Sequence, residues 1–386
     1  MQLYIHMVNR TLWIEKIEKS WQERSILWLT GVRRVGKTTL ARSLADCEYM
    51  DCELPRIRRQ LEDPEGFLKS FGSGRLILDE VHRLDNPSEF LKIAADHFPG
   101  VRILATGSST LGASQRFRDT LTGRKRDLHL FPVLLRELKT FEGISLPRRL
   151  QNGGLPENLM NPDFPEKDYA EWLDAFWARD VQELFRLERR DAFMRLLELL
   201  LTQSGCLCQL NSFTSACSAS HTTLANYLNV LEATGVVHIV RPYAKNPQRE
   251  IVAMPKVYGF DTGFVCFARG WLELRDGDHG VLWEHLVLDE LLARFGRDAI
   301  FYWRDKQKHE VDFVLARRGL PPVAIECKWR MHDDAGKNFS SMRTLHPDLH
   351  GLVVAADVDR PRVNRANGWI ETGLAGIEHG IAMLAG

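Results

Sequence analysis

The sequence predicts an α/β fold: a core with a parallel sheet, then a mainly helical region and a second α/β unit. Three observations support this prediction. Short apolar runs alternate with helix-like stretches through residues 25–131, as in sheets whose two faces are both covered by helices. The strand signal then disappears until about residue 236. The chain also has 386 residues, more than one hydrophobic core normally serves, so we expect two or three domains.

The predicted core follows a charged, amphipathic lead-in at residues 1–24. Its strands are expected at the four apolar runs of residues 25–30, 75–78, 101–105 and 127–131. The first run ends in a glycine loop, and a helical stretch follows it. Strands connected through helices pair in parallel, and such sheets bind ligands at the edge where the carboxyl ends of the strands meet.

Helices are expected after the core. Residues 132–191 show helical patterns broken by turn residues, which predicts a helical lid. Residues 192–258 contain two apolar helical stripes, the second between a Ser220 cap and a Gly235 stop, and then a strand-like run at residues 236–240. The order helix, short helix, helix and strands predicts a winged helix-turn-helix.

A second α/β unit is predicted at residues 259–386. A long helix is expected at residues 280–295. Strand-like runs follow at residues 299–303, 310–315, 323–327 and 352–355.

The composition is that of a soluble globular protein, with 44% hydrophobic and 26% charged residues. Lys and Arg together number 51, as do Asp and Glu, so any contact with nucleic acid must be regional. No apolar run is long enough to span a membrane and the first residues do not resemble a signal peptide, so we expect a cytoplasmic protein without a membrane partner. Seven scattered cysteines predict reduced thiols.

Residues 31–39, Gly-Val-Arg-Arg-Val-Gly-Lys-Thr-Thr, fit the phosphate-binding pattern G-x-x-x-x-G-K-[ST] between a strand and a helix. Glycines let the backbone turn tightly, so that its amides point inward at an anion. In this pattern Lys37 reaches the β- and γ-phosphates and the Thr38 hydroxyl binds Mg²⁺. The residues predicted to bind ATP are Gly31, Arg34, Gly36, Lys37, Thr38 and Thr39.

Two more strand ends carry polar residues that this chemistry requires. The strand at residues 75–78 runs into Asp79 and Glu80, which we expect to hold Mg²⁺ and to orient the attacking water, respectively. The next strand is followed by hydroxyl residues that include Ser108. Ser108 either contacts the γ-phosphate or caps the following helix.

The motifs GVRRVGKTT, LILDE, TGSS, LTGR, GGLPE (residues 153–157) and ARD (residues 178–180) occur in this order. Together they resemble the AAA-type ATP-binding proteins, related to archaeal STAND-like ATPases, that carry a C-terminal domain of unknown function. The resemblance implies a helical lid, a winged helix and a C-terminal domain with the restriction-endonuclease fold. It also implies that Arg124 reaches the γ-phosphate of a neighbouring subunit in a homo-oligomer. Otherwise Arg124 is one surface arginine of a basic cluster.

Acidic side chains recur in the last predicted unit. Alternation along residues 310–315 and 323–328 places Asp312, Glu326 and Lys328 opposite the apolar positions of their strands. The residues between these strands are turn-like, so we expect a hairpin that brings Asp312 beside Glu326 and Lys328.

Glu284 lies on the apolar stripe of the helix at residues 280–295, so we expect it to point inward. With Asp312, Glu326 and Lys328 it resembles the signature of PD-(D/E)XK nucleases, although Val-Asp stands in place of Pro-Asp. The resemblance implies that the three carboxylates bind Mg²⁺ and that Lys328 helps to activate water. The alternative is a fold that keeps its acids for structure or binding.

Two functions follow for an ATPase of this kind. In the first, ATP hydrolysis drives the winged helix and the nuclease-like domain on DNA. In the second, the protein is a nucleotide-dependent switch that binds a protein partner through an inactive nuclease-like fold. Residues 222–233, the expected recognition helix, contain no Lys or Arg, which favours packing over direct reading of DNA.

Overall fold

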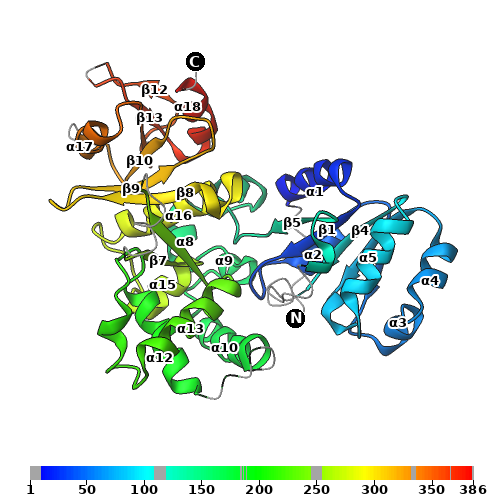
Figure 1. Ribbon diagram of the computed structural model, residues 1–386. Coiled ribbons are helices and arrows are strands. Elements are labelled where there is room, and N and C mark those ends of the chain that lie inside the picture. Colours follow the sequence, from blue (N-terminus) through cyan, green and yellow to red (C-terminus); the bar gives the residue numbers. More distant parts are fainter. Residues whose placement is uncertain are drawn as a thin grey trace.

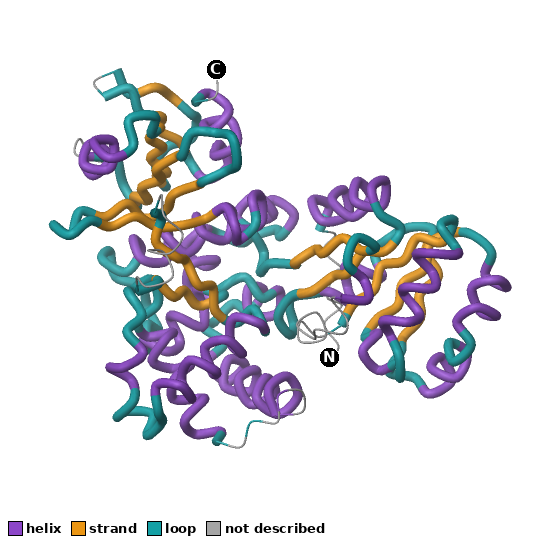
Figure 2. The backbone as a smooth tube through the Cα atoms, in the orientation of Figure 1, coloured by secondary structure: helices purple, strands orange, loops and turns teal. Residues whose placement is uncertain are grey.

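A computed structural model describes residues 10–107, 119–182, 185, 187, 189–244, 254–331, 336–365 and 367–384. Figure 1 shows two halves side by side, with the chain up to β5 in one half and most of the remainder in the other. Each half has its own sheet, and the strands drawn in Figure 2 form two separate groups.

The first sheet has five strands in the order β2-β3-β4-β1-β5, and every neighbouring pair is parallel. The strands are β1 (Ile26–Thr30), β2 (Cys47–Asp51), β3 (Gly74–Asp79), β4 (Val101–Thr106) and β5 (Lys125–His129). The predicted parallel core is therefore confirmed. β2 was not predicted, because it is an edge strand in which only Met50 is buried, and so it lacks an apolar run.

Helices cover both faces of this sheet. They are α1 (Thr11–Glu23), α2 (Lys37–Arg42), α3 (Pro55–Gln60), α4 (Pro64–Phe71) and α5 (Pro87–His97), with a short turn η1 (Val81–Arg83) after β3. Alternation along β1 divides the core: Leu27 packs in one cluster with Trp13 of α1, and Trp28 packs in another with Phe90 of α5. α1 attaches through Trp13, Ile17 and Trp21, which are spaced four residues apart on one helix face.

The middle of the chain is mainly helical, as expected. Its elements are η2 (Leu135–Thr140), α8 (Leu146–Asn152), α9 (Pro156–Met160), α10 (Glu166–Ala175), η3 (Phe176–Gln182), α12 (Arg190–Thr202), η4 (Leu210–Phe213) and α13 (His221–Ala233). Ser220 caps α13 by accepting a hydrogen bond from the Thr223 amide at 3.2 Å. The chain leaves the helix through Gly235, whose φ of 77° suits glycine.

The second sheet has eight strands in the order β12-β13-β11-β10-β9-β8-β6-β7. The strands are β6 (Val237–Pro242), β7 (Lys256–Gly259), β8 (Ile300–Arg304), β9 (Glu310–Leu315), β10 (Val323–Lys328), β11 (His350–Ala355), β12 (Arg362–Val363) and β13 (Ile370–Thr372). The accompanying helices are α15 (Thr262–Arg269), α16 (His279–Phe295), α17 (Lys337–Leu345) and α18 (Ile377–Met383), with the turns η5 (Arg297–Ala299) and η6 (Leu374–Gly376).

This sheet joins two of the predicted domains. β6 pairs with β7 and also, in parallel, with β8, where Arg241 lies opposite Phe301. The predicted boundary after residue 258 therefore falls inside β7, and the one after residue 191 falls inside α12. Strand pairing across the boundary makes the β6–β7 hairpin part of the C-terminal sheet.

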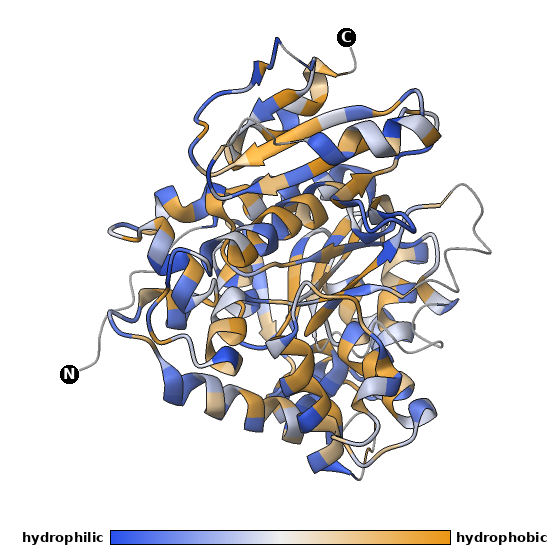
Figure 3. Ribbon diagram, turned by 90° about the vertical axis from the view of Figure 1, so that its left-hand side faces the viewer, coloured by the Kyte–Doolittle hydropathy of each residue, from blue (hydrophilic) through white to orange (hydrophobic). Residues whose placement is uncertain are grey.

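A continuous core connects the two halves. One buried cluster extends from Trp13 of α1 through Trp172 of α10 and Phe264 of α15 to Ile325 of β10. In Figure 3 the hydrophobic residues gather along the strands and inner helices. No helix among the described residues is long and apolar enough to cross a membrane. All seven cysteines are free thiols.

A buried arginine, Arg149, attaches α8 to the C-terminal half. The fully buried Arg149 guanidinium donates to the Val133 carbonyl at 2.6 Å and to Thr262 Oγ1 at 3.0 Å, and lies 3.5 Å from Asp289. Next to it, the Gly154 amide donates to Asp261 at 2.6 Å. Arg149 belongs to α8 and Asp289 to α16, so these two helices are attached directly to each other.

Candidate functional site

The glycine loop lies between β1 and α2, where the sequence predicts it. Gly31 and Gly36 have positive φ angles of 150° and 98°. A Cβ at Gly31 would lie 2.6 Å from the Leu130 carbonyl oxygen, so the backbone passes too close for any other residue. Arg34 also has a positive φ, 60°, although it is not a glycine. The loop therefore takes a backbone path that the two glycines make possible.

Lys37 lies against its own loop. Its Nζ donates hydrogen bonds to the carbonyls of Gly31 at 2.8 Å and Val32 at 3.1 Å. Burial lowers the pKa of Lys37, and the negative charges of Glu80 and Asp180 offset this only in part. A polyanion bound at this loop would stabilise the charged ammonium, so the site suits a phosphate group.

Asp79 ends β3 as a buried carboxylate held by two hydroxyl groups. It accepts hydrogen bonds from Tyr49 at 2.6 Å and from Thr106 at the end of β4. Burial and the Asp79 contact raise the pKa of the Tyr49 phenol, which keeps its proton for this bond. Thr106 Oγ1 also accepts the Glu80 amide at 3.1 Å, so this hydroxyl holds the acidic pair rather than facing a phosphate. Ser108 lies outside the described residues.

Glu80 follows with a positive φ of 55°. Its Oε2 lies 3.1 Å from Nδ1 of His82. Burial alone would raise the pKa of Glu80, but the His82 contact and the positive charges of Lys37 and Arg33 outweigh it, so the pKa is lowered. Glu80 is therefore an ionised carboxylate near the loop lysine, as a group that orients water must be.

The loop is also held from outside the sheet. Arg33 Nε lies 2.9 Å from Asp180 of η3, and Trp172 of α10 donates to the Arg33 carbonyl at 2.9 Å. Pro156, at the start of α9, lies 3.7 Å from the position of a Cβ at Gly36. The GGLPE and ARD motifs thus reach the glycine loop, which the sequence did not reveal.

These residues fit ATP and Mg²⁺. The parallel pairing of β1, β4 and β3 places Thr38, Asp79 and Glu80 after the carboxyl ends of strands in one sheet. Lys37 supplies the charge that phosphates need. Thr38 and Asp79 supply the hydroxyl and carboxylate oxygens that Mg²⁺ prefers. Thr39 is exposed at the start of α2.

Arg124 lies at the opposite edge of the same sheet. Lys125 pairs with Ile26 at the beginning of β1, whereas the glycine loop follows Thr30 at its end. Five strand residues separate the two edges, or about 16 Å. Arg124 Nε also binds Asp96 of α5 at 2.7 Å. Arg124 therefore lies far from the glycine loop of its own chain, and its role toward a neighbouring subunit remains a prediction.

The predicted hairpin is confirmed: β9 and β10 pair antiparallel, and the Asp312 carboxylate lies beside Cys327, the residue between Glu326 and Lys328. The β9–β10 ladder ends at the pair Phe313 and Ile325, because beyond it the Asp312 carboxylate accepts the Cys327 amide at 2.7 Å. Glu326 accepts the Gly336 amide at 2.7 Å and pairs with Lys328 at 2.6 Å. Each acid thus already has a partner within the protein.

A lysine that the sequence did not single out lies among these acids. Lys256 of β7 is 3% exposed, with Nζ 2.6 Å from Glu310 and 3.5 Å from Glu284. Glu284 also accepts a hydrogen bond from Tyr258. Burial lowers the pKa of Lys256, but Glu284, Asp312 and Glu310 outweigh it and raise the pKa. Burial of Asp312 itself and the negative charge of Glu284 raise the pKa of the Asp312 carboxyl group.

With the Lys256 ammonium among them, these acids do not form a magnesium site. Mg²⁺ needs several oxygen ligands in near-octahedral geometry, with metal–oxygen distances of about 2.0–2.1 Å. Among the residues that the structure describes, no group of three or more His, Cys, Asp or Glu side chains could hold a metal ion. The metal-binding role of Glu284, Asp312 and Glu326 therefore stays a prediction.

The fold and the loop define the N-terminal half as a P-loop nucleotide-binding domain. Residues 23–139 match the family model described as AAA domain. Residues 144–275 and 279–370 match models of two domains of unknown function, DUF8612 and DUF4143. The findings support an AAA-type ATPase domain at residues 23–139, followed by two domains whose function the family descriptions do not give.

Two relatives match most of this chain, and their names give no function. The uncharacterized proteins Rv2008c of Mycobacterium tuberculosis and Mb2031c of Mycobacterium bovis are each 28% identical over 321 residues, covering 79% of this chain and 71% of the relative. Among solved structures, a Walker-type ATPase of Pyrococcus abyssi has a TM-score of 0.45 and 16% identity, covering 68% of this chain and 96% of its own. AMPPCP-bound DnaA of Aquifex aeolicus has a TM-score of 0.28 and 14% identity, with 59% and 89% covered.

Sequence motifs do not predict some residues of the site. Tyr49, His82 and Asp180 approach the site from β2, η1 and η3. Lys256 lies in β7, far from Glu310 in sequence. A signal existed only for Asp180, because it belongs to the ARD motif that the family resemblance had singled out.

Replacing Lys37 with Ala should abolish measurable ATP binding. Losing one member of a desolvated charge pair costs about 2–5 kcal/mol, or a roughly 30-fold or greater loss of affinity. Calorimetric titration with a non-hydrolysable ATP analogue measures it. Lys69→Ala, at an exposed position of α4, is the matched control. Unchanged affinity in Lys37→Ala would show that the site is wrongly assigned.

Proposed function

We propose that this protein is a Mg²⁺-dependent ATPase that transmits its nucleotide state to the C-terminal half. The observation that carries the proposal is the position of Glu80 directly after β3, at the same edge of the sheet as the glycine loop after β1, with the Glu80 amide held by Thr106. The AAA domain match at residues 23–139 supports it.

In this mechanism Lys37 leaves the Gly31 and Val32 carbonyls and binds the β- and γ-phosphates. Glu80 orients a water for attack on the γ-phosphate and takes up its proton, while the bond from the γ-phosphorus to the bridging oxygen breaks and ADP leaves. Tyr49 and Thr106 keep the Asp79 carboxylate in one orientation. Bound Mg²⁺ supplies charge neutralisation on the phosphates.

The nucleotide state reaches the C-terminal half through contacts at the loop. Arg33 is paired with Asp180, and Gly235, in the turn before β6, lies close to Val32. A change of loop conformation on hydrolysis would alter both contacts, and so shift the helices that carry them.

α16 extends this path. Its Asp289 and Glu290 pair with Arg149 and Arg136 from the helical segment after the core. The same helix carries Glu284 into the C-terminal acidic cluster. One rigid helix therefore connects the loop region with that cluster.

For the output, the geometry favours a switch that binds a protein partner over an enzyme that cuts nucleic acid. The acids of the C-terminal half are paired within the protein. The exposed positions of α13 carry His221, Thr222, Asn226 and Asn229, so this helix offers no Lys or Arg to phosphates.

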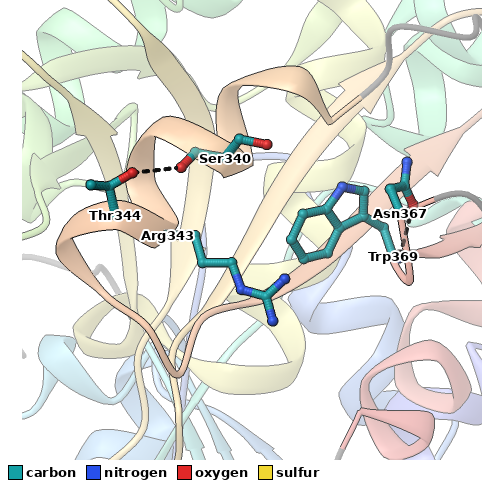
Figure 4. Close-up of a pocket in the computed structure, with 5 residues that line it drawn as sticks. All are labelled: Ser340, Arg343, Thr344, Asn367 and Trp369. Carbon is teal, nitrogen blue, oxygen red and sulfur yellow. Dashed lines mark hydrogen bonds between the residues drawn. The ribbon is translucent and has the colours of Figure 1, made fainter.

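A specific observation keeps DNA as the second candidate. A surface hollow of about 490 Å³ lies beside α17, lined by Ser340, Arg343, Thr344, Asn367 and Trp369 (Figure 4). It has no acidic lining residue, and the Arg343 guanidinium lies 5.2 Å from the centre of the Trp369 ring. A cation beside hydroxyl and amide groups is able to bind a backbone phosphate.

Replacing Glu80 with Gln should leave ATP binding intact and slow hydrolysis. The amide keeps the shape of the side chain but cannot take up a proton, so we expect a roughly 100- to 10,000-fold lower kcat. Single-turnover phosphate release measures it, with Glu62→Gln at an exposed position as control. Hydrolysis at the wild-type rate would remove Glu80 from the mechanism.

Replacing His82 with Ala should move the acid limb of the kcat–pH profile to higher pH. The pKa of Glu80 is lowered in the folded protein, so the carboxylate is ionised above that value and lost as pH falls through it. Without His82 the pKa rises, and Glu80 is protonated at a higher pH. A steady-state pH series measures the shift. An unmoved acid limb would contradict the role of His82.

If DNA is the ligand, duplex or single-stranded DNA should stimulate ATP hydrolysis, and added salt should abolish the stimulation. Arg343→Ala should then lower the slope of log affinity against log salt by about 1. The exposed Arg102, in the other half, is the control position. An ATPase rate indifferent to every DNA tested would leave the partner-binding switch as the function.

A further inference from the structure

The C-terminal acidic cluster contains its own cation. We define the cluster as Glu284 of α16 and Glu310 and Asp312 of β9. Lys256 Nζ lies 2.6 Å from Glu310 Oε1 and 3.5 Å from Glu284 Oε1. Its side chain is 4% exposed, so water screens these interactions weakly.

The other contacts of the cluster keep its carboxylates in place. Tyr258 donates to the Glu284 oxygen that faces Lys256, and Arg304 binds the second oxygen of Glu310 at 2.8 Å. Asp312 accepts the Cys327 amide. Buried carboxylates need such partners, because an uncompensated buried charge is strongly unfavourable.

A divalent ion would have to replace this ammonium. An ion ligated by Glu284 and Glu310 would occupy the region that Nζ occupies, and its two positive charges would repel the lysine. The partner shell of Lys256 consists of carboxylates, which are also the oxygen ligands that Mg²⁺ and Mn²⁺ take. The cluster therefore has the chemistry of a cation site in which a side chain already provides the cation.

We propose that Lys256 is the resident cation of this cluster: while its ammonium is in place the C-terminal half binds no divalent metal there, and removing the ammonium creates a divalent-cation site. The nuclease-like arrangement is then held together by an internal ion pair instead of a metal. Because Lys256 comes from β7 and Glu284 from α16, the ammonium also links the β6–β7 hairpin to the helix that meets Arg149. This inference does not depend on ATP hydrolysis.

The experiment compares Mn²⁺ binding by the nucleotide-free full chain, measured by electron paramagnetic resonance. All proteins carry Thr38→Ala, so that the P-loop cannot contribute a metal ligand. We expect no Mn²⁺ bound at the cluster in the protein with Lys256 intact. Lys256→Met should gain one Mn²⁺ per chain, at least about tenfold tighter than the protein with Lys256, in line with the usual effect of changing a metal's surroundings.

Matched variants separate the ammonium from general disturbance. Lys256→Arg keeps a cation and should gain no Mn²⁺. Lys328→Met removes the nearby lysine that pairs with Glu326 and should also gain none. Adding Glu284→Gln to Lys256→Met should lose the new site, because a ligand is removed. Of these variants, only Lys256→Met should have a higher melting temperature in the presence of Mn²⁺.

Two results overturn the proposal. One is Mn²⁺ bound in the protein with intact Lys256 and lost in Asp312→Asn, which would mean that the cluster holds a metal beside the lysine. The other is a folded Lys256→Met that binds Mn²⁺ no more tightly than the protein with Lys256. The first measurement needs no Lys256 variant, so the proposal remains testable if Lys256→Met does not fold. Neither result bears on the Lys37 site.

Discussion

The Arg149 guanidinium is the contact on which the arrangement of the two halves depends. It is fully buried, donates hydrogen bonds to Val133, after β5, and to Thr262 of α15, and lies 3.5 Å from Asp289 of α16. Removing one partner from a buried ion pair costs about 3–5 kcal/mol, because the other charge is left without compensation. The pairing therefore fixes the position of α16 relative to α8.

This junction gives the nucleotide site neighbours that a sheet alone would not provide. Pro156, which follows the loop at residues 153–155, approaches Gly36, and Asp180 of η3 pairs with Arg33. Loops at the edge of an α/β sheet are usually free to move, and here one is enclosed by segments from the second half. A change in the conformation of the glycine loop would therefore alter its contacts with these packed segments, as a nucleotide-dependent switch requires.

In the C-terminal half, buried carboxylates need compensating charges or hydrogen-bond donors. A buried carboxylate must be paired with a cation or accept hydrogen bonds, and a bound metal ion is one such cation. Here Lys256, Tyr258 and the Cys327 amide supply them instead. The resemblance to a nuclease signature and the paired state of the acids are compatible, because the strand positions are the same whichever cation compensates them.

The sequence by itself determined the parallel core, the glycine loop, the acidic end of β3 and the cap of α13. Each of these is encoded within a few consecutive residues, as an apolar run, a glycine spacing or a capping side chain. Only the tertiary structure decided that Thr106 holds Asp79, that Arg124 lies at the far edge of the sheet, and that Lys256 enters the acidic cluster. These contacts join strands and helices distant in sequence, and a local pattern carries no information about which distant charge will meet it. Burial and the competition among charges, which act only once the chain has folded, settle those pairings.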